Sequence, residues 1–111
     1  MITSDPRFAR GVALFNAGDY LEASDEFEEL FFEAVRDEVE FIRIFLQFST
    51  GLHHVQTKQR RPAIERIEVG LKVVAADDFG IDLVALHEGM RAGLASFKRG
   101  EDPVWPQVRT R

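Results

Sequence analysis

Apolar residues recur at helical spacing along the whole chain, and no segment alternates apolar and polar residues as a β-strand would. The strongest case is the segment from about Glu38 to Lys58, which is apolar over most of a helix circumference. Such a helix is typical of the centre of a bundle, because only there are nearly all of its sides removed from water. With 111 residues, 45% of them hydrophobic, the chain can build one substantial core. We therefore predict an all-α, single-domain bundle over residues 1–111.

Caps and chain breakers divide the sequence into about five helices with short connections, so consecutive helices should be antiparallel neighbours. The expected helices run from 5 to the break at 16–18, from 19 to about 36, from about 38 to 58, from near 62 to the loop at 77–80, and from 82 to 99. An extended tail follows this helical core over residues 100–111, and Trp105 is expected to cover a core edge. Gly89 and Gly93 lie four residues apart, which would let a neighbouring helix approach closely.

Charged residues are unevenly distributed along the chain. Residues 19–40 hold ten acidic side chains against one basic one, whereas residues 58–72 hold five basic side chains against two acidic ones. One interpretation is two solvated faces that attract each other across the bundle, and another is an anion site at Arg60 and Arg61. The formal net charge of -5 disfavours nucleic acid as a partner.

Signals for export, membrane insertion and cysteine chemistry are missing from the sequence. No basic segment followed by an apolar run opens the chain. The most apolar stretch, from Phe41 to Leu52, contains Arg43 and Gln47 and is too short to span a bilayer. The absence of cysteine excludes disulfides, a thiol nucleophile and cysteine-ligated zinc. We expect a cytoplasmic protein with no membrane partner.

Polar residues enter the predicted apolar face of the second helix. The main face of that helix is widened on one side by three further apolar residues, Leu21, Phe32 and Val35. The widened arc includes Ser24 and Glu28, and Asp25 lies at its edge. A buried carboxylate is costly unless it is paired, bound to a metal or protonated. Glu28 is therefore either a site residue or a side chain that reaches water beside Phe32.

The central helix collects its polar residues into one stripe that contains Gln47 and His54, two turns apart. The stripe is either the wet side of this helix, or it faces Ser24, Asp25 and Glu28 across the hairpin and forms an internal polar cluster. In the second case, carboxylate, amide and imidazole would converge as a hydrogen-bond network, a metal site or a small-molecule pocket. No metal-binding motif such as His-Glu-x-x-His occurs, and the sequence identifies no cofactor or ligand.

Three sequence blocks occur in order at fitting distances. They are 15–31, which begins Phe-Asn-Ala-Gly-Asp-Tyr-Leu-Glu-Ala; 45–54, which contains Phe-Leu-Gln and Leu-His-His; and 61–63, which reads Arg-Pro-Ala. Together they resemble a prokaryotic all-helical family catalogued as domain of unknown function 309, over roughly residues 8–75. The resemblance implies an all-α bundle and supplies no established activity.

The same resemblance implies that Glu28, Gln47 and His54 occupy the polar positions of the family. Ser24 stands where the family usually has His, and Asp25 where it usually has Glu. Loss of the His removes the strongest potential metal ligand or proton carrier from these positions. An activity of the family at this cluster would then be lost in this chain.

Two classes of function fit the sequence. The first is a binding or interaction module, which forms a homo-oligomer because ten Phe in so small a chain leave apolar surface exposed. The second is a metal-dependent or acid–base enzyme, with Glu28 or Asp25 as ligand or base, Gln47 as positioning group and His54 as ligand or acid.

A short tetratricopeptide-like scaffold is a further hypothesis. The segment 18–23, Gly-Asp-Tyr-Leu-Glu-Ala, resembles the helical hairpin of such repeats. A repeat of this kind needs at least about three stacked copies, and the only internal echo is Ala23 with Ala63.

Overall fold

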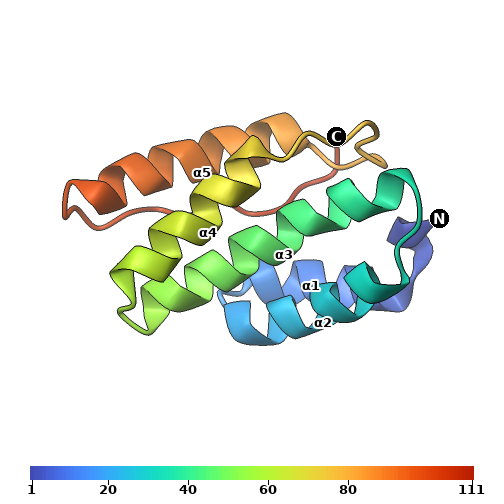
Figure 1. The fold of residues 1–111 in the computed structure, drawn as a ribbon, viewed down its shortest axis with the longest axis horizontal. Helices are drawn as coiled ribbons and strands as arrows, with labels where there is room; N and C mark the ends of the chain where they lie inside the picture. The colour runs from blue at the N-terminus through green and yellow to red at the C-terminus, as the bar shows by residue number, and fades with distance from the viewer.

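The computed structural model describes residues 1–111, and the chain folds into helices without a regular strand (Figure 1). The elements are a short 3-10 turn, Ile2–Ser4, and five α-helices: α1, Pro6–Asn16; α2, Tyr20–Glu33; α3, Asp37–Gln56; α4, Arg60–Lys72; and α5, Leu83–Lys98. The predicted all-α bundle is therefore confirmed. None of these helices combines the length and the apolar character that crossing a membrane requires.

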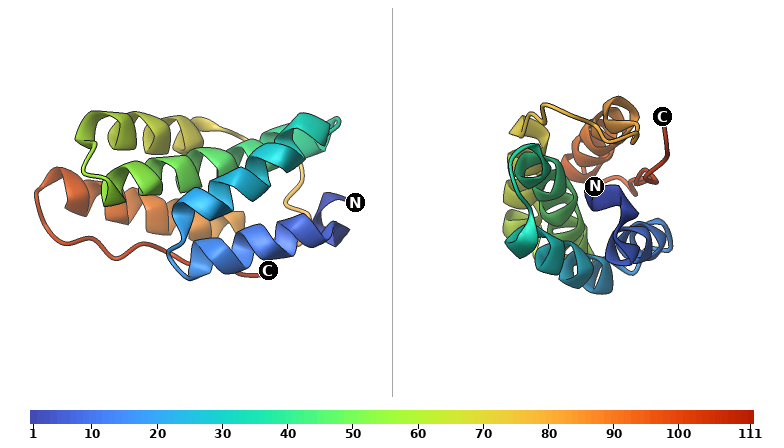
Figure 2. Two further views of the ribbon diagram at one scale, coloured as in Figure 1. Left: turned by 90° about the horizontal axis from the view of Figure 1, so that it is seen from below. Right: turned by 90° about the vertical axis from the view of Figure 1, so that its right-hand side faces the viewer.

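Helix α3 is the centre of the bundle, as its nearly uniform apolar character predicts. Phe41, Phe45, Phe48 and Leu52 along this helix are completely buried. The Phe45 ring meets Phe8 of α1 and Phe27 of α2, with centroid distances of 5.4 Å in both cases. Helices α1, α2 and α3 thus share one aromatic core, and α3 lies between α2 and α4 (Figures 1 and 2).

Two glycines set how closely α3 and α4 approach. A Cβ atom built on Gly51 of α3 would lie 2.7 Å from the Ile67 side chain and 3.2 Å from the Ile67 backbone nitrogen. A Cβ atom built on Gly70 of α4 would lie 2.6 Å from the Phe48 ring. Since any side chain here would force the helices apart, glycine is required on both sides of the contact.

The last helix is covered by the chain that follows it. Residues 100–111, which we call the strap, run from the end of α5 back toward α1 (Figure 2). A Cβ atom on Gly89 would lie 2.5 Å from Pro106, and one on Gly93 would lie 2.5 Å from the Trp105 ring. The two glycines therefore admit the strap, and the prediction that they admit a helix is wrong. Trp105 packs against the core as expected.

Polar contacts fix the strap at its far end. The side-chain amide of Asn16 donates to the Val108 carbonyl at 3.0 Å and accepts from the Val108 N–H at 2.7 Å. Beyond it, Thr110 forms an isolated antiparallel bridge with Ile81. The strap thus joins the end of α1 to the loop before α5.

Helices α2 and α4 end earlier than the sequence indicates. Helix α2 stops at Glu33, because Ala34 is extended and Arg36 has a φ of 54°, a left-handed backbone. Helix α4 stops at Lys72, so that Val74, which falls within the range expected for this helix, lies beyond it and is 83% exposed. A segment of about ten residues connects α4 to α5, which is longer than the short connection expected.

Candidate functional site

The structure does not gather the predicted polar residues into one internal cluster. Asp25 and Glu28 are exposed on α2. Ser24 is buried, but its hydroxyl donates to the Leu21 carbonyl of the same helix at 2.7 Å. The hypothesis of a buried Glu28 is therefore wrong, and its carboxylate lies in water.

The polar stripe of α3 lies between α2 and α4. Gln47 lies on the α4 side, where its side-chain oxygen accepts a long hydrogen bond of 3.5 Å from Arg66. Arg43 lies on the α2 side, with its guanidinium 5.0 Å above the centre of the Phe31 ring. No hydrogen bond joins Gln47 to Asp25 or Glu28, so the predicted contact across the α2–α3 hairpin is absent.

His54 is half-buried near the end of α3, and its Nδ1 atom has no hydrogen-bond partner within the protein. Nowhere in the structure do three His, Asp or Glu side chains lie close enough together to hold a metal ion. The imidazole, amide and carboxylates of the enzyme hypothesis are thus separate groups, without the mutual contacts that shared acid–base work requires.

The wrong prediction of a buried Glu28 has a geometric cause. On α2 the core takes only the side that carries Ala23, Phe27 and Leu30. Leu21 and Phe32 point away from that side, although both are apolar. Counting them as core residues widened the predicted buried arc until it included Glu28.

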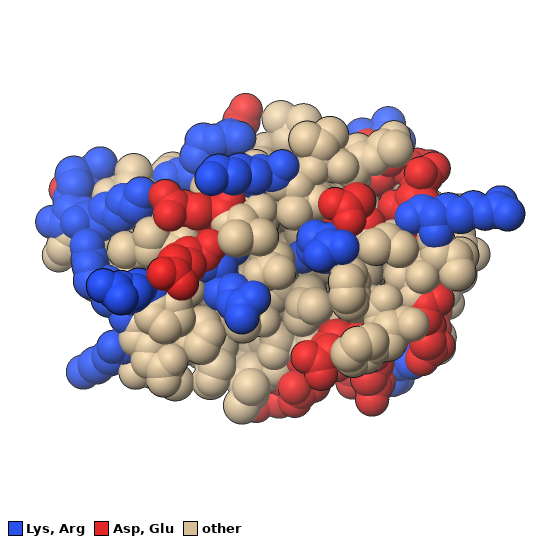
Figure 3. Space-filling view, in the orientation of Figure 1, with Lys and Arg blue, Asp and Glu red and all other residues tan.

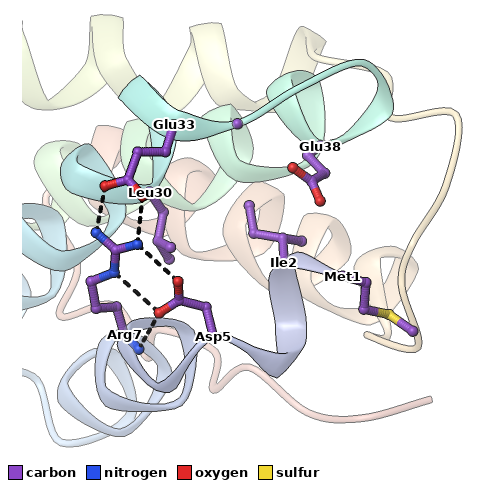
Figure 4. A pocket seen from close by; sticks show the side chains of 8 residues that line it. Met1, Ile2, Asp5, Arg7, Leu30, Glu33 and Glu38 are labelled. Atoms are coloured by element: carbon purple, nitrogen blue, oxygen red, sulfur yellow. Dashed lines mark hydrogen bonds and ion pairs between the residues drawn. The ribbon is translucent and has the colours of Figure 1, made fainter.

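The α1 side of α2 carries acids that are already paired. Arg7 contacts Glu33 at 2.7 Å and Asp5 at 2.8 Å, beside a small pocket of about 230 Å³ at the start of the chain (Figure 4). Hydrogen bonds from Arg7 lower the pKa of Asp5 to about 2 and also lower the pKa of Glu33. Arg10 pairs with Glu26 at 3.4 Å. The ion pairs with Glu33 and Glu26 join α1 to α2.

The outward side of α2 differs from this paired flank. We define its outer stripe as four residues of α2 at spacings of four and three, Leu21, Asp25, Glu28 and Phe32. Leu21 and Phe32 are 46% and 78% exposed. Val35, which is 60% exposed, lies beyond the end of the helix. Asp25 and Glu28 take part in no ion pair. The outer stripe is thus apolar at both ends and acidic in the middle.

Opposite charges occupy different parts of the molecular surface. In Figure 3, acidic side chains gather along the lower right edge, over α2 and the start of α3, and basic side chains gather at the left end. That end holds the α3–α4 loop and the end of α5 (Figure 1). No ion pair joins residues 19–40 to residues 58–72, so the two charged segments make no direct contact with each other.

Arg60 has a structural role in place of the predicted anion site. Its guanidinium donates to the carbonyls of Phe97 and Lys98 at 3.2 and 3.0 Å and lies 5.0 Å above the centre of the Phe97 ring. It therefore caps the end of α5, whose last carbonyls have no partner within the helix. Arg61 makes no such contact.

Arg7 and Phe32 are absent from the sequence-predicted site residues. Asp5 and Arg7 lie two residues apart at a helix cap, which is a local signal for their pairing, but the contact with Glu33 requires the packing of α1 on α2. The signal for Phe32 is the outer stripe itself, since an apolar stripe interrupted by two carboxylates does not suit a buried face.

Comparisons with known proteins agree with the fold. No curated protein matches the sequence. A family described as "Domain of unknown function (DUF309)" matches residues 8–65, from the first turn of α1 to the first half of α4. The matched region contains all of α2 and α3, and with them the outer stripe. Since the match spans more than half of the residues, the chain belongs to the DUF309 family.

Proposed function

We propose that this chain is a protein-interaction module whose outer stripe docks a basic, amphipathic helix of a partner protein. The observation that supports the proposal is the exposed Phe32, beside two carboxylates that have no partner within the chain. Phe32 is 78% exposed, and a partner that covers its ring would remove that apolar area from water, which favours binding.

The spacing of the outer stripe fits a helix. Positions 21, 25, 28 and 32 follow each other at intervals of four and three, which is the pattern of a coiled-coil seam. A partner helix laid along α2 would cover Leu21 at one end and Phe32 at the other. Helix-in-groove recognition uses apolar anchors at this spacing.

The charge of the stripe selects a basic partner. Asp25 and Glu28 lie between the apolar anchors, so a partner helix should place Lys or Arg opposite them. Two copies of this chain that pair through the same stripe would bring four carboxylates together, which is repulsive. Self-association through the outer stripe, one form of the homo-oligomer expected from the sequence, is therefore disfavoured.

The test uses two designed helical peptides and a charge-reversed protein. One peptide carries Leu anchors around two Lys at heptad positions, and the other carries Glu in place of Lys. The wild-type chain should bind the Lys peptide at least tenfold more tightly than the Glu peptide, as measured by fluorescence anisotropy. The Asp25→Lys/Glu28→Lys variant should invert that preference.

Glu22→Lys is the matched control, because Glu22 is exposed on the flank of α2, outside the stripe, and takes part in no ion pair. It should keep most of the preference for the Lys peptide, and circular dichroism should show all variants equally helical. Equal affinity for both peptides, or an effect of Glu22→Lys as large as that of the double variant, would overturn the proposal. So would a dimer, detected by sedimentation, that Phe32→Ser dissociates.

A further inference from the structure

A second surface, separate from the outer stripe, contains a cleft of about 540 Å³. The cleft lies between α1, the turn at residues 79–81 and the strap at residues 108–110. It shares no residue with the outer stripe. Its volume falls in the range of roughly 300–1,000 Å³ that is typical of small-molecule sites.

The floor of this cleft is apolar and fixed in place. Phe8, Ile81 and Val108 form the floor and are 4–6% exposed. The Ile81–Thr110 bridge and the two hydrogen bonds of Asn16 to Val108 hold the strap side. The cleft is thus formed before any ligand arrives, which reduces the entropy cost of binding.

Small side chains on α1 keep the cleft open. Ala9 and Ala13 line it one turn apart, and both are exposed. A longer side chain at either position would fill the space above Phe8. The cleft therefore depends on alanine at two exposed positions that are not part of the core.

A single charged side chain lines the cleft. Arg109 is exposed and forms no ion pair, and its only side-chain contact is a long hydrogen bond of 3.5 Å to Gln107. Neighbouring Arg111, in contrast, is paired with Asp78 at 2.9 Å. No acidic residue lines the cleft. The site therefore combines an apolar floor with one uncompensated positive charge.

From this combination we infer that the cleft binds a small amphipathic carboxylate. The apolar part of the ligand covers Phe8, Ile81 and Val108, and the carboxylate accepts hydrogen bonds from the Arg109 guanidinium, whose fork geometry suits it. A medium-chain fatty acid has this chemistry. An alcohol of the same length shares the apolar part and lacks the charge.

The test compares octanoate with octanol by two-dimensional NMR of the full chain. Octanoate should shift the amide resonances of α1, residues 79–81 and residues 108–110, with an affinity several-fold above that of octanol. Arg109→Gln should remove most of this difference. The dissociation constant for octanoate should rise about fivefold, whereas the dissociation constant for octanol should not change. Arg91→Gln, on exposed α5 surface with no ion pair, is the charge control.

Ala9→Phe tests the site itself, because it fills the cleft from an exposed helix position. It should abolish binding of both ligands, whereas Ala92→Phe, on exposed α5 surface, should leave both unchanged. Binding that survives Ala9→Phe, or resonance shifts confined to other parts of the chain, would overturn the site. Equal affinities of wild type and Arg109→Gln for octanoate would overturn the anionic ligand.

Discussion

Arg7 connects two carboxylates that lie far apart in the sequence. It contacts Asp5, the N-cap residue of α1, and Glu33, 26 residues away, at the end of α2. Both contacts lie at the surface, where a single ion pair contributes little to stability. The network nonetheless controls how the protein responds to acid, because it lowers the pKa of both carboxylates.

We predict a loss of stability between about pH 4.5 and 2 that depends on Arg7. The unfolded pKa values of Asp5 and Glu33 are near 3.8 and 4.5, and both are lower in the folded protein. The two carboxylates therefore stabilise the folded protein above their unfolded pKa values. This stabilisation is lost as pH falls through the folded pKa values, of which that of Asp5 is about 2. Arg7→Gln should flatten this part of the pH profile of urea unfolding. Arg91→Gln should not, and high salt should weaken the effect. Parallel profiles for wild type and Arg7→Gln would contradict the prediction.

At the scale of elements, the end of α5 depends on a side chain from the start of α4. Arg60 and Arg61 are adjacent, equally charged and both exposed, but only Arg60 reaches the α5 carbonyls. Substituting each arginine separately therefore distinguishes the contribution of the cap to stability from that of the positive charge.

We predict that Arg60→Gln lowers the free energy of unfolding by about 1 kcal/mol, since it removes two charge-assisted hydrogen bonds and the contact with the Phe97 ring. Arg61→Gln should change it by less than about 0.5 kcal/mol. Thermal or urea unfolding monitored by circular dichroism gives both values. Equal losses in the two variants would show that net charge, and not the cap, is responsible.

The helices themselves are predictable from the sequence, but the direction in which each face points is less so. Helix α3 is apolar nearly all round, so its central position follows without knowledge of its neighbours. Helix α2 has apolar residues on two sides, and only the packing of α1 and α3 decides that Phe27 is buried and Phe32 exposed. The misplacement of Glu28 follows directly from this ambiguity.

A close contact on α5 is also easier to predict than the segment that makes it. Gly89 and Gly93 indicate that something packs tightly on α5, and the structure shows that this is the strap. A pair of small residues leaves room for any backbone, and the sequence pattern does not distinguish a helix from an extended segment. For the same reason the cleft beside Val108 has no local sequence signal, because its walls come from three separate parts of the chain.

At the scale of the whole molecule, Asn16 joins the end of α1 to the strap. It bonds both backbone groups of Val108, 92 residues away. We predict that Asn16→Ala costs about 1–3 kcal/mol, because two partly buried backbone groups lose their partner. Amide hydrogen exchange at residues 105–110 should accelerate in the same variant.

Gln107→Ala is the control for this prediction. Gln107 contacts only the Asn16 carbonyl, at 3.3 Å, and the Arg109 side chain, at 3.5 Å, and it is exposed. Its substitution should change stability by less than about 0.5 kcal/mol. Unchanged hydrogen exchange in the strap of Asn16→Ala would show that Trp105 and Pro106 hold this segment without help from α1.

The strap has a consequence for how fast the protein folds. Helices α1 to α4 meet their neighbours in chain order, which permits rapid folding through contacts that are close in sequence. The contact between Asn16 and Val108 instead requires closure of a loop of 92 residues, with the entropy cost that such a loop carries. Refolding should therefore end with the arrival of the strap on a bundle that has already formed, and local opening of the native protein should begin at the same place.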